Sequence, residues 1–100
     1  MTIKTVPFDA AEFLDTAEAQ ATLISDAFSS DDPAYISHAI GVVARARGMT
    51  QTARQAGVTR EALYRSLSEN GDPRLSTLVG VMKALGMRVK VEPIPEPEAA

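Results

Sequence analysis

The sequence contains no cysteine and no tryptophan, and its aromatic residues are two Tyr and three Phe. Without cysteine the chain can form neither disulfides nor thiolate metal sites, and it has no thiol nucleophile; this usage fits a reducing cytoplasm, where we expect the protein to reside. No apolar run approaches the roughly 20 residues that cross a bilayer, and the first residues lack the charged start and apolar stretch of a signal peptide, so we predict no membrane contact. A core of Ala, Leu, Ile, Val and Met favours closely packed helices.

Residues suited to catalysis or metal binding are also scarce. His38 is the sole histidine, and it lies off the apolar stripe of its predicted helix, which predicts an exposed side chain. A lone His without Cys cannot form a common zinc site, and the carboxylates of residues 9–32 lack the spacing of an EF-hand. No glycine-rich phosphate loop is present. We therefore predict a binding protein with no metal and no cofactor, and not an enzyme.

Charge is unevenly distributed along the chain. Residues 1–35 carry one Lys against seven acids, a net charge of −6, whereas residues 36–68 carry five Arg against one Glu, a net charge of +4. A basic middle segment is what a local phosphate-binding surface would produce in a chain whose overall charge is −3. A chance cluster of solvated arginines is the alternative.

Capping residues and apolar periodicity predict an all-α chain of about five short helices. Asp9 and Glu12 have capping-box spacing, and Asp32 followed by Pro33 is a strong helix start. The further helices are predicted over residues 16–28, 33–47, 50–56, 59–67 and 75–85. Gly41 and Gly80 fall inside predicted helices, where close helix–helix packing would explain them. We expect one domain over residues 1–92, with acidic N-terminal helices over 1–32 and a DNA-binding core over 33–86.

The last part of the chain predicts a strand. Residues 87–92 alternate apolar and charged side chains, with Met87, Val89 and Val91 on one face. Because the sequence offers no other convincing strand, we predict that this one pairs with the same strand of a second copy and forms a homodimer. Pairing with residues 2–6 of the same chain is the alternative. Residues 93–100 form a Pro/Glu tail that we expect to be disordered.

The segment from Met49 to Leu67 has the pattern of a helix-turn-helix. Ala53 is small, as needed where the second helix crosses the first, and Gly57 tolerates the positive φ of a tight turn. Val58 and Leu63 face the core. This arrangement turns the outer face of the second helix toward solvent, and in such proteins that face enters the major groove of DNA.

Polar residues on both helices are the predicted DNA contacts. Arg is suited to bidentate contact with guanine, and the start of a helix is suited to phosphate. The predicted DNA-binding residues are Thr50, Gln51, Thr52, Thr59, Arg60, Glu61, Tyr64 and Arg65. A plain helical hairpin without DNA binding is the alternative.

Several stretches together resemble the probable addiction-module antidote proteins, which are short Cro/repressor-type antitoxins. They run in the family's order over residues 8–16, 44–51, 57–64, 70–73 and 83–89. The resemblance implies an XRE-like repressor of its own operon that binds double-stranded operator DNA and neutralises a RelE/ParE-like toxin. A free-standing repressor without a toxin and an interaction adaptor that has lost DNA binding remain open. The acidic residues 1–35 are a candidate toxin surface, although acids at helix starts also stabilise helices as caps.

Overall fold

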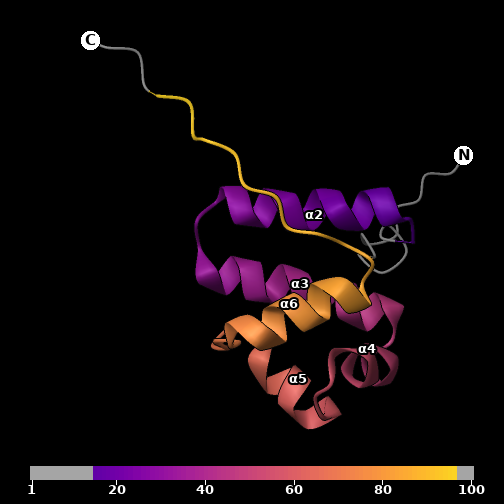
Figure 1. Ribbon diagram of the computed structural model, residues 1–100. Helices are drawn as coiled ribbons and strands as arrows, with labels where there is room; N and C mark the ends of the chain where they lie inside the picture. Colours follow the sequence, from indigo (N-terminus) through magenta and orange to yellow (C-terminus); the bar gives the residue numbers. More distant parts are fainter. Residues whose placement is uncertain (1–14, 97–100) are drawn as a thin grey trace, which may run out of the picture.

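The computed structural model describes residues 15–96, and over this range the chain is all-helical. Five helices follow one another: α2 (Ala17–Ser29), α3 (Pro33–Arg47), α4 (Met49–Ala56), α5 (Arg60–Ser66) and α6 (Leu75–Ala84). Figure 1 shows α2 and α3 side by side at one end of the molecule, α4 and α5 at the other end, and α6 between them. The helix predicted near Asp9 and the alternative strand over 2–6 lie outside the described residues.

Side-chain caps mark the starts of α2 and α3, and the cap at Asp32 is the one predicted from the sequence. Thr16 caps α2, its Oγ1 accepting from the Ala19 N–H at 3.1 Å. Asp32 caps α3, its Oδ1 accepting from the Ala34 N–H at 3.0 Å, and Pro33 follows in the first helical position. The predicted helix bounds agree with the observed ones to within one or two residues. Side-chain caps mark the starts of α2, α3 and α5, whereas α4 and α6 begin without one.

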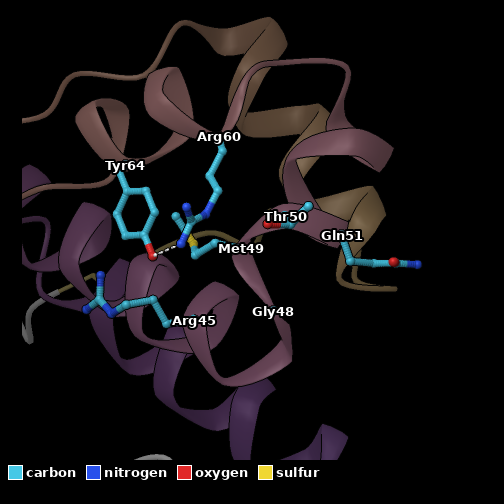
Figure 2. A pocket seen from close by; sticks show the side chains of 7 residues that line it. All are labelled: Arg45, Gly48, Met49, Thr50, Gln51, Arg60 and Tyr64. Atoms are coloured by element: carbon cyan, nitrogen blue, oxygen red, sulfur yellow. Dashed lines mark hydrogen bonds between the residues drawn. The ribbon is translucent and has the colours of Figure 1, made fainter.

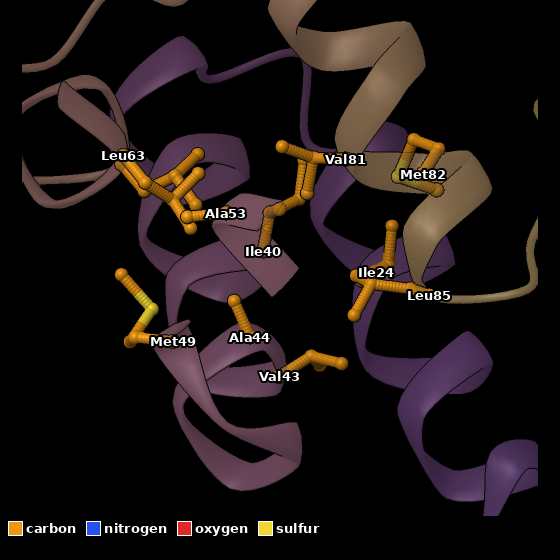
Figure 3. Close-up of a cluster of buried hydrophobic side chains, with 11 residues drawn as sticks. Ile24, Ile40, Val43, Ala44, Met49, Ala53, Leu63, Val81, Met82 and Leu85 are labelled. Carbon is orange, nitrogen blue, oxygen red and sulfur yellow. The ribbon is translucent and has the colours of Figure 1, made fainter. Parts of the chain in front are cut away.

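One core holds the helices together, and it is built almost entirely from aliphatic side chains (Figure 3). Its largest fully buried members come from three helices: Ile40, Val43, Leu63 and Val81. Ile24 joins α2 to this core. The Tyr35 hydroxyl also donates to Asp26 Oδ2 at 2.8 Å, and this hydrogen bond raises the pKa of Tyr35. The acidic helix α2 is therefore a structural part of the domain.

Gly41 and Gly80 lie where two backbones approach closely, as predicted. A Cβ on Gly41 would lie 2.9 Å from the carbonyl oxygen of Leu67, and one on Gly80 would lie 3.0 Å from that of Ala56. The first contact sets the distance between α3 and the end of α5, and the second sets the crossing of α4 and α6. Both helices give up about 1 kcal/mol of helix propensity for these approaches.

The predicted strand over 87–92 is wrong: residues 87–96 have no regular secondary structure. A strand needs a hydrogen-bonded neighbour, and the described part of the chain offers none. Met87 packs against the core, whereas Val89 and Val91 are exposed, so the three do not form one buried face. Residues 93–96 are likewise exposed, and the remainder of the predicted tail lies outside the described residues. Among the described helices none is long and apolar enough to cross a membrane.

Candidate nucleic-acid interface

The turn between α4 and α5 is fixed by a glycine in the left-handed region. Gly57 has φ 78° and ψ 27°. Its N–H donates to the Arg54 carbonyl at 3.2 Å, and the Val58 N–H donates to the Ala53 carbonyl at 3.0 Å. These two bonds are the Schellman pattern that ends a helix on a left-handed residue. Gly57 therefore has the positive φ that the sequence predicts for it.

The start of α5 is equally well defined. Thr59 is its N-cap, and its Oγ1 accepts from the Ala62 N–H at 3.0 Å. Leu63 is fully buried, Ala53 is buried beneath it on α4, and Val58 packs partly buried against the same core. These contacts hold α5 by one face and leave the opposite face in solvent.

Seven of the eight predicted DNA-binding residues are exposed. They are Thr50, Gln51, Thr59, Arg60, Glu61, Tyr64 and Arg65. The eighth, Thr52, is only 2% exposed, and its hydroxyl donates to the Gly48 carbonyl at 2.8 Å. Its side chain therefore holds the first turn of α4 in place and does not face solvent.

The two helices and the end of α3 enclose a shallow hollow of ≈ 570 Å³ (Figure 2). It is lined by Arg45, Gly48, Met49, Thr50, Gln51, Arg60 and Tyr64. Gly48 is the N-cap of α4 and supplies no side-chain acceptor, so no side chain caps the first-turn N–H groups. Such N–H groups, at the positive end of a helix dipole, favour an anion.

Arg60 and Tyr64 contact each other across one turn of α5. The guanidinium Nη2 lies 3.4 Å from the Tyr64 hydroxyl, and Cζ lies 5.2 Å from the ring centroid. Figure 2 shows both side chains over the hollow. A cation over an aromatic face at this distance is stabilised by about 0.5–1 kcal/mol at an exposed site. The ring thus restricts where the charge of Arg60 lies.

Arg45, in the last turn of α3, is a charged residue of this hollow that is not among the predicted DNA contacts. It lies outside the two-helix motif, so the motif's spacing could not find it. The cluster of five arginines was the available signal, but that signal does not separate Arg45 from Arg47. The structure separates them, because the Arg47 Nη1 donates to the buried Gln20 Oε1 at 3.0 Å whereas Arg45 lines the hollow.

The positive charges around the hollow are not neutralised by the described part of the chain. Within residues 15–96 no carboxylate forms an ion pair with the guanidinium groups of Arg45, Arg60 or Arg65. Glu61 is exposed on the same helix without such a contact. The surface combines cations, hydroxyl and amide groups and free helix N–H groups, which is the chemistry that binds phosphate and base edges.

Comparison with known proteins identifies the family. Residues 4–93 match the family model described as probable addiction module antidote protein. An uncharacterized protein of Haemophilus influenzae is 40% identical over 92 residues, which cover 92% of this chain and 95% of that protein. No solved structure matches the chain. The chain belongs to the family of probable addiction-module antidote proteins, and an antidote implies a cognate toxin as its partner.

Proposed function

We propose that this antidote is a DNA-binding antitoxin that represses its own operon and neutralises a toxin encoded beside it. It acts by binding and catalyses no reaction. Family membership supports the antitoxin over a free-standing repressor, because an antidote needs a toxin. DNA binding rests on the surface of α4 and α5.

One observation carries the proposal: the guanidinium groups of Arg45 and Arg60 lie on the same hollow as the uncapped first turn of α4. These groups come from three consecutive helices, and the Schellman turn at Gly57 fixes the relation between α4 and α5. Unpaired cations beside free helix N–H groups favour the binding of an anion. A DNA backbone supplies the anions that this arrangement lacks.

In the proposed complex α4, the Gly57 turn and α5 act as a repressor-type, XRE-like helix-turn-helix. The exposed face of α5 enters the major groove, which is about 12 Å wide and admits one α-helix. Arg60 and Arg65 read base edges or phosphates, while Thr50, Gln51 and Arg45 hold the backbone. Two copies bind together, one on each half of the operator.

The toxin completes the proposal. The resemblance implies a RelE/ParE-like toxin, and the described acids of the acidic segment lie just before α2, on α2 and in the turn that follows it. Figure 1 places α2 at the opposite end of the molecule from α5. Toxin bound at α2 would leave the α4–α5 surface free for the operator.

The DNA part is tested by a gel shift with the DNA upstream of the chain's own gene, at several salt concentrations. We expect Arg60→Ala to weaken binding by about 1–3 kcal/mol and to reduce discrimination against unrelated DNA. Arg88→Ala is the matched control, because Arg88 is also exposed but lies in the C-terminal segment. Equal binding by wild type and Arg60→Ala would remove α5 as the reading helix.

The antitoxin part is tested separately by co-expression with a toxin-sized neighbouring gene. We expect growth arrest by that gene product alone and recovery when the full chain is supplied. A gene product that arrests growth regardless of the chain would contradict the assignment of a cognate pair. The DNA experiment would stand in that case.

A further inference from the structure

The exposed face of α5 carries one large apolar group among polar ones. Tyr64 is 40% exposed, and among the described residues it is the only exposed large hydrophobic side chain on α4 or α5. The guanidinium of Arg60 lies over its ring, with Cζ 5.2 Å from the centroid and Nη2 3.4 Å from the hydroxyl. Figure 2 shows the two side chains meeting over the hollow. This face therefore presents a cation and an aromatic ring as one unit, the Arg60–Tyr64 pair.

We infer that the Arg60–Tyr64 pair reads two neighbouring base pairs of the operator, a guanine through the guanidinium and a thymine through the ring. The inference rests on the proposed DNA-binding function and names the sequence element that this function recognises. It assigns Arg60 to a base edge instead of a phosphate. It also gives the Tyr64 ring a contact with DNA in addition to its contact with Arg60.

The choice of guanine follows from the donors of Arg60. A guanidinium has five N–H donors and no acceptor. The Tyr64 hydroxyl accepts from Nη2, which leaves donors enough for a fork on two acceptors. Guanine presents two acceptors in the major groove, O6 and N7, whereas adenine presents an acceptor beside a donor. Within residues 15–96 no carboxylate pairs with Arg60, so the fork is available to the base.

The choice of thymine follows from the ring of Tyr64. The C5-methyl of thymine is the apolar group that base pairs present in the major groove, and aromatic side chains contact it. A phosphate offers the ring no apolar surface. The spacing fits adjacent bases, because the two residues lie one helical turn apart, about 5.4 Å along the axis, and stacked base pairs are about 3.4 Å apart. Since the guanidinium lies against the ring, their targets are neighbours as well.

Base analogues that change single atoms test the inference by gel shift. The probe is the shortest fragment of the upstream DNA that the full chain shifts, with one guanine at a time replaced by 7-deazaguanine and one thymine at a time by deoxyuridine. The first analogue lacks the N7 acceptor, and the second lacks only the methyl group. We expect a guanine at which wild type loses about tenfold or more in affinity. On a neighbouring base pair we expect a thymine at which it loses about fourfold, the effect of one methyl group.

Protein variants assign each base to its residue. Arg60→Ala should bind the 7-deazaguanine probe and the unmodified probe equally, because the fork on N7 is gone. Tyr64→Ala should likewise be insensitive to the loss of the thymine methyl, whereas Tyr64→Phe keeps the ring and should keep this effect. Arg65→Ala is the matched control, since it removes an exposed cation of the same helix and should leave both analogue effects unchanged.

Other outcomes overturn the inference. A guanine effect that persists in Arg60→Ala, or a thymine effect that persists in Tyr64→Ala, would give that base to another residue. A wild-type chain that shifts the upstream DNA but responds to no analogue would place both side chains on the phosphate backbone, and the proposed function would stand. A wild-type chain that shifts no DNA at any salt concentration would overturn the proposed function and this inference together.

Discussion

Gly57 is the residue on which the direction of α5 depends. Its φ of 78° lies in the left-handed region, and nothing lies within 4 Å of the position that a Cβ would take. A side chain would therefore have room, and its cost would come from the backbone alone. The same reasoning applies to Gly86, whose φ of 70° ends α6 with the same pair of hydrogen bonds.

Gly57→Ala should lower the free energy of unfolding by about 1–2 kcal/mol, the cost of a Cβ in the left-handed region. Gly57→Asn should lower the free energy of unfolding by less, since Asn tolerates the left-handed conformation. Urea denaturation followed by circular dichroism measures both, with Gln55→Ala as an exposed control on the same helix. If Ala and Asn were equally costly, a steric clash would have to replace the backbone explanation.

In the proposed DNA complex, Tyr64 acts on binding through its contact with Arg60. Tyr64→Ala removes the ring beneath the guanidinium and should weaken operator binding by about 0.5–1 kcal/mol, whereas Tyr64→Phe keeps the ring and should bind nearly as wild type. The coupling is measured with the double variant Arg60→Ala/Tyr64→Ala in the same gel shift. Additive losses would show that the two residues act on DNA independently.

At the scale of elements, the packing of α3 on the end of α5 depends on Gly41. Gly41→Ala gains about 1 kcal/mol of helix propensity but places Cβ 2.9 Å from the backbone oxygen of Leu67, where overpacking costs about 1–3 kcal/mol. We expect net destabilisation and a lower thermal midpoint. His38→Ala, at an exposed position of the same helix, is the control: it introduces Ala into α3 without creating a contact with Leu67. If the Gly41→Ala variant were more stable than the wild type, the end of α5 would be able to move away from α3 at little cost.

The elements that could be predicted from sequence are those with local signals. Asp32, Thr59 and Gly57 each specify a helix end through their own hydrogen bonds or φ, so the bounds of α3 to α5 followed from neighbouring residues alone. A strand over 87–92 could not be predicted in this way. A strand forms only where a second strand accepts and donates its backbone hydrogen bonds, and the alternation of apolar and charged residues does not show whether one is present. Arg45 and Thr52 needed the three-dimensional arrangement, which turns one into the hollow and the other into the interior.

At the scale of the whole molecule, a toxin surface on the acidic segment has to be tested by substitution and not by deletion. Ile24 and Ala27 of α2 are buried in the domain, so removing the segment would expose the core. Exposed acids are the better targets. Asp15→Lys/Glu18→Lys reverses charge at the start of α2 while leaving its buried residues unchanged.

If the toxin binds the acidic segment through a basic surface, this double variant should slow its association about tenfold at low salt and leave operator binding unchanged. Surface plasmon resonance measures the association rate, and the gel shift measures operator binding. Ser25→Lys adds a positive charge on the same helix without removing an acid. It therefore separates the effect of added positive charge from the effect of losing Asp15 and Glu18. An unchanged association rate would place the toxin elsewhere on the molecule.

The separation of acidic α2 from the basic α4–α5 surface also governs how the protein behaves on charged resins. Its pI of about 5.0 suggests an anion exchanger at neutral pH, and the α2 end supplies the carboxylates for that matrix. Heparin presents anions like those of a nucleic-acid backbone, so the arginine end should be retained there as well. A preparation that binds both columns under one buffer need not be a mixture of two species, because each matrix holds an opposite end of the same molecule.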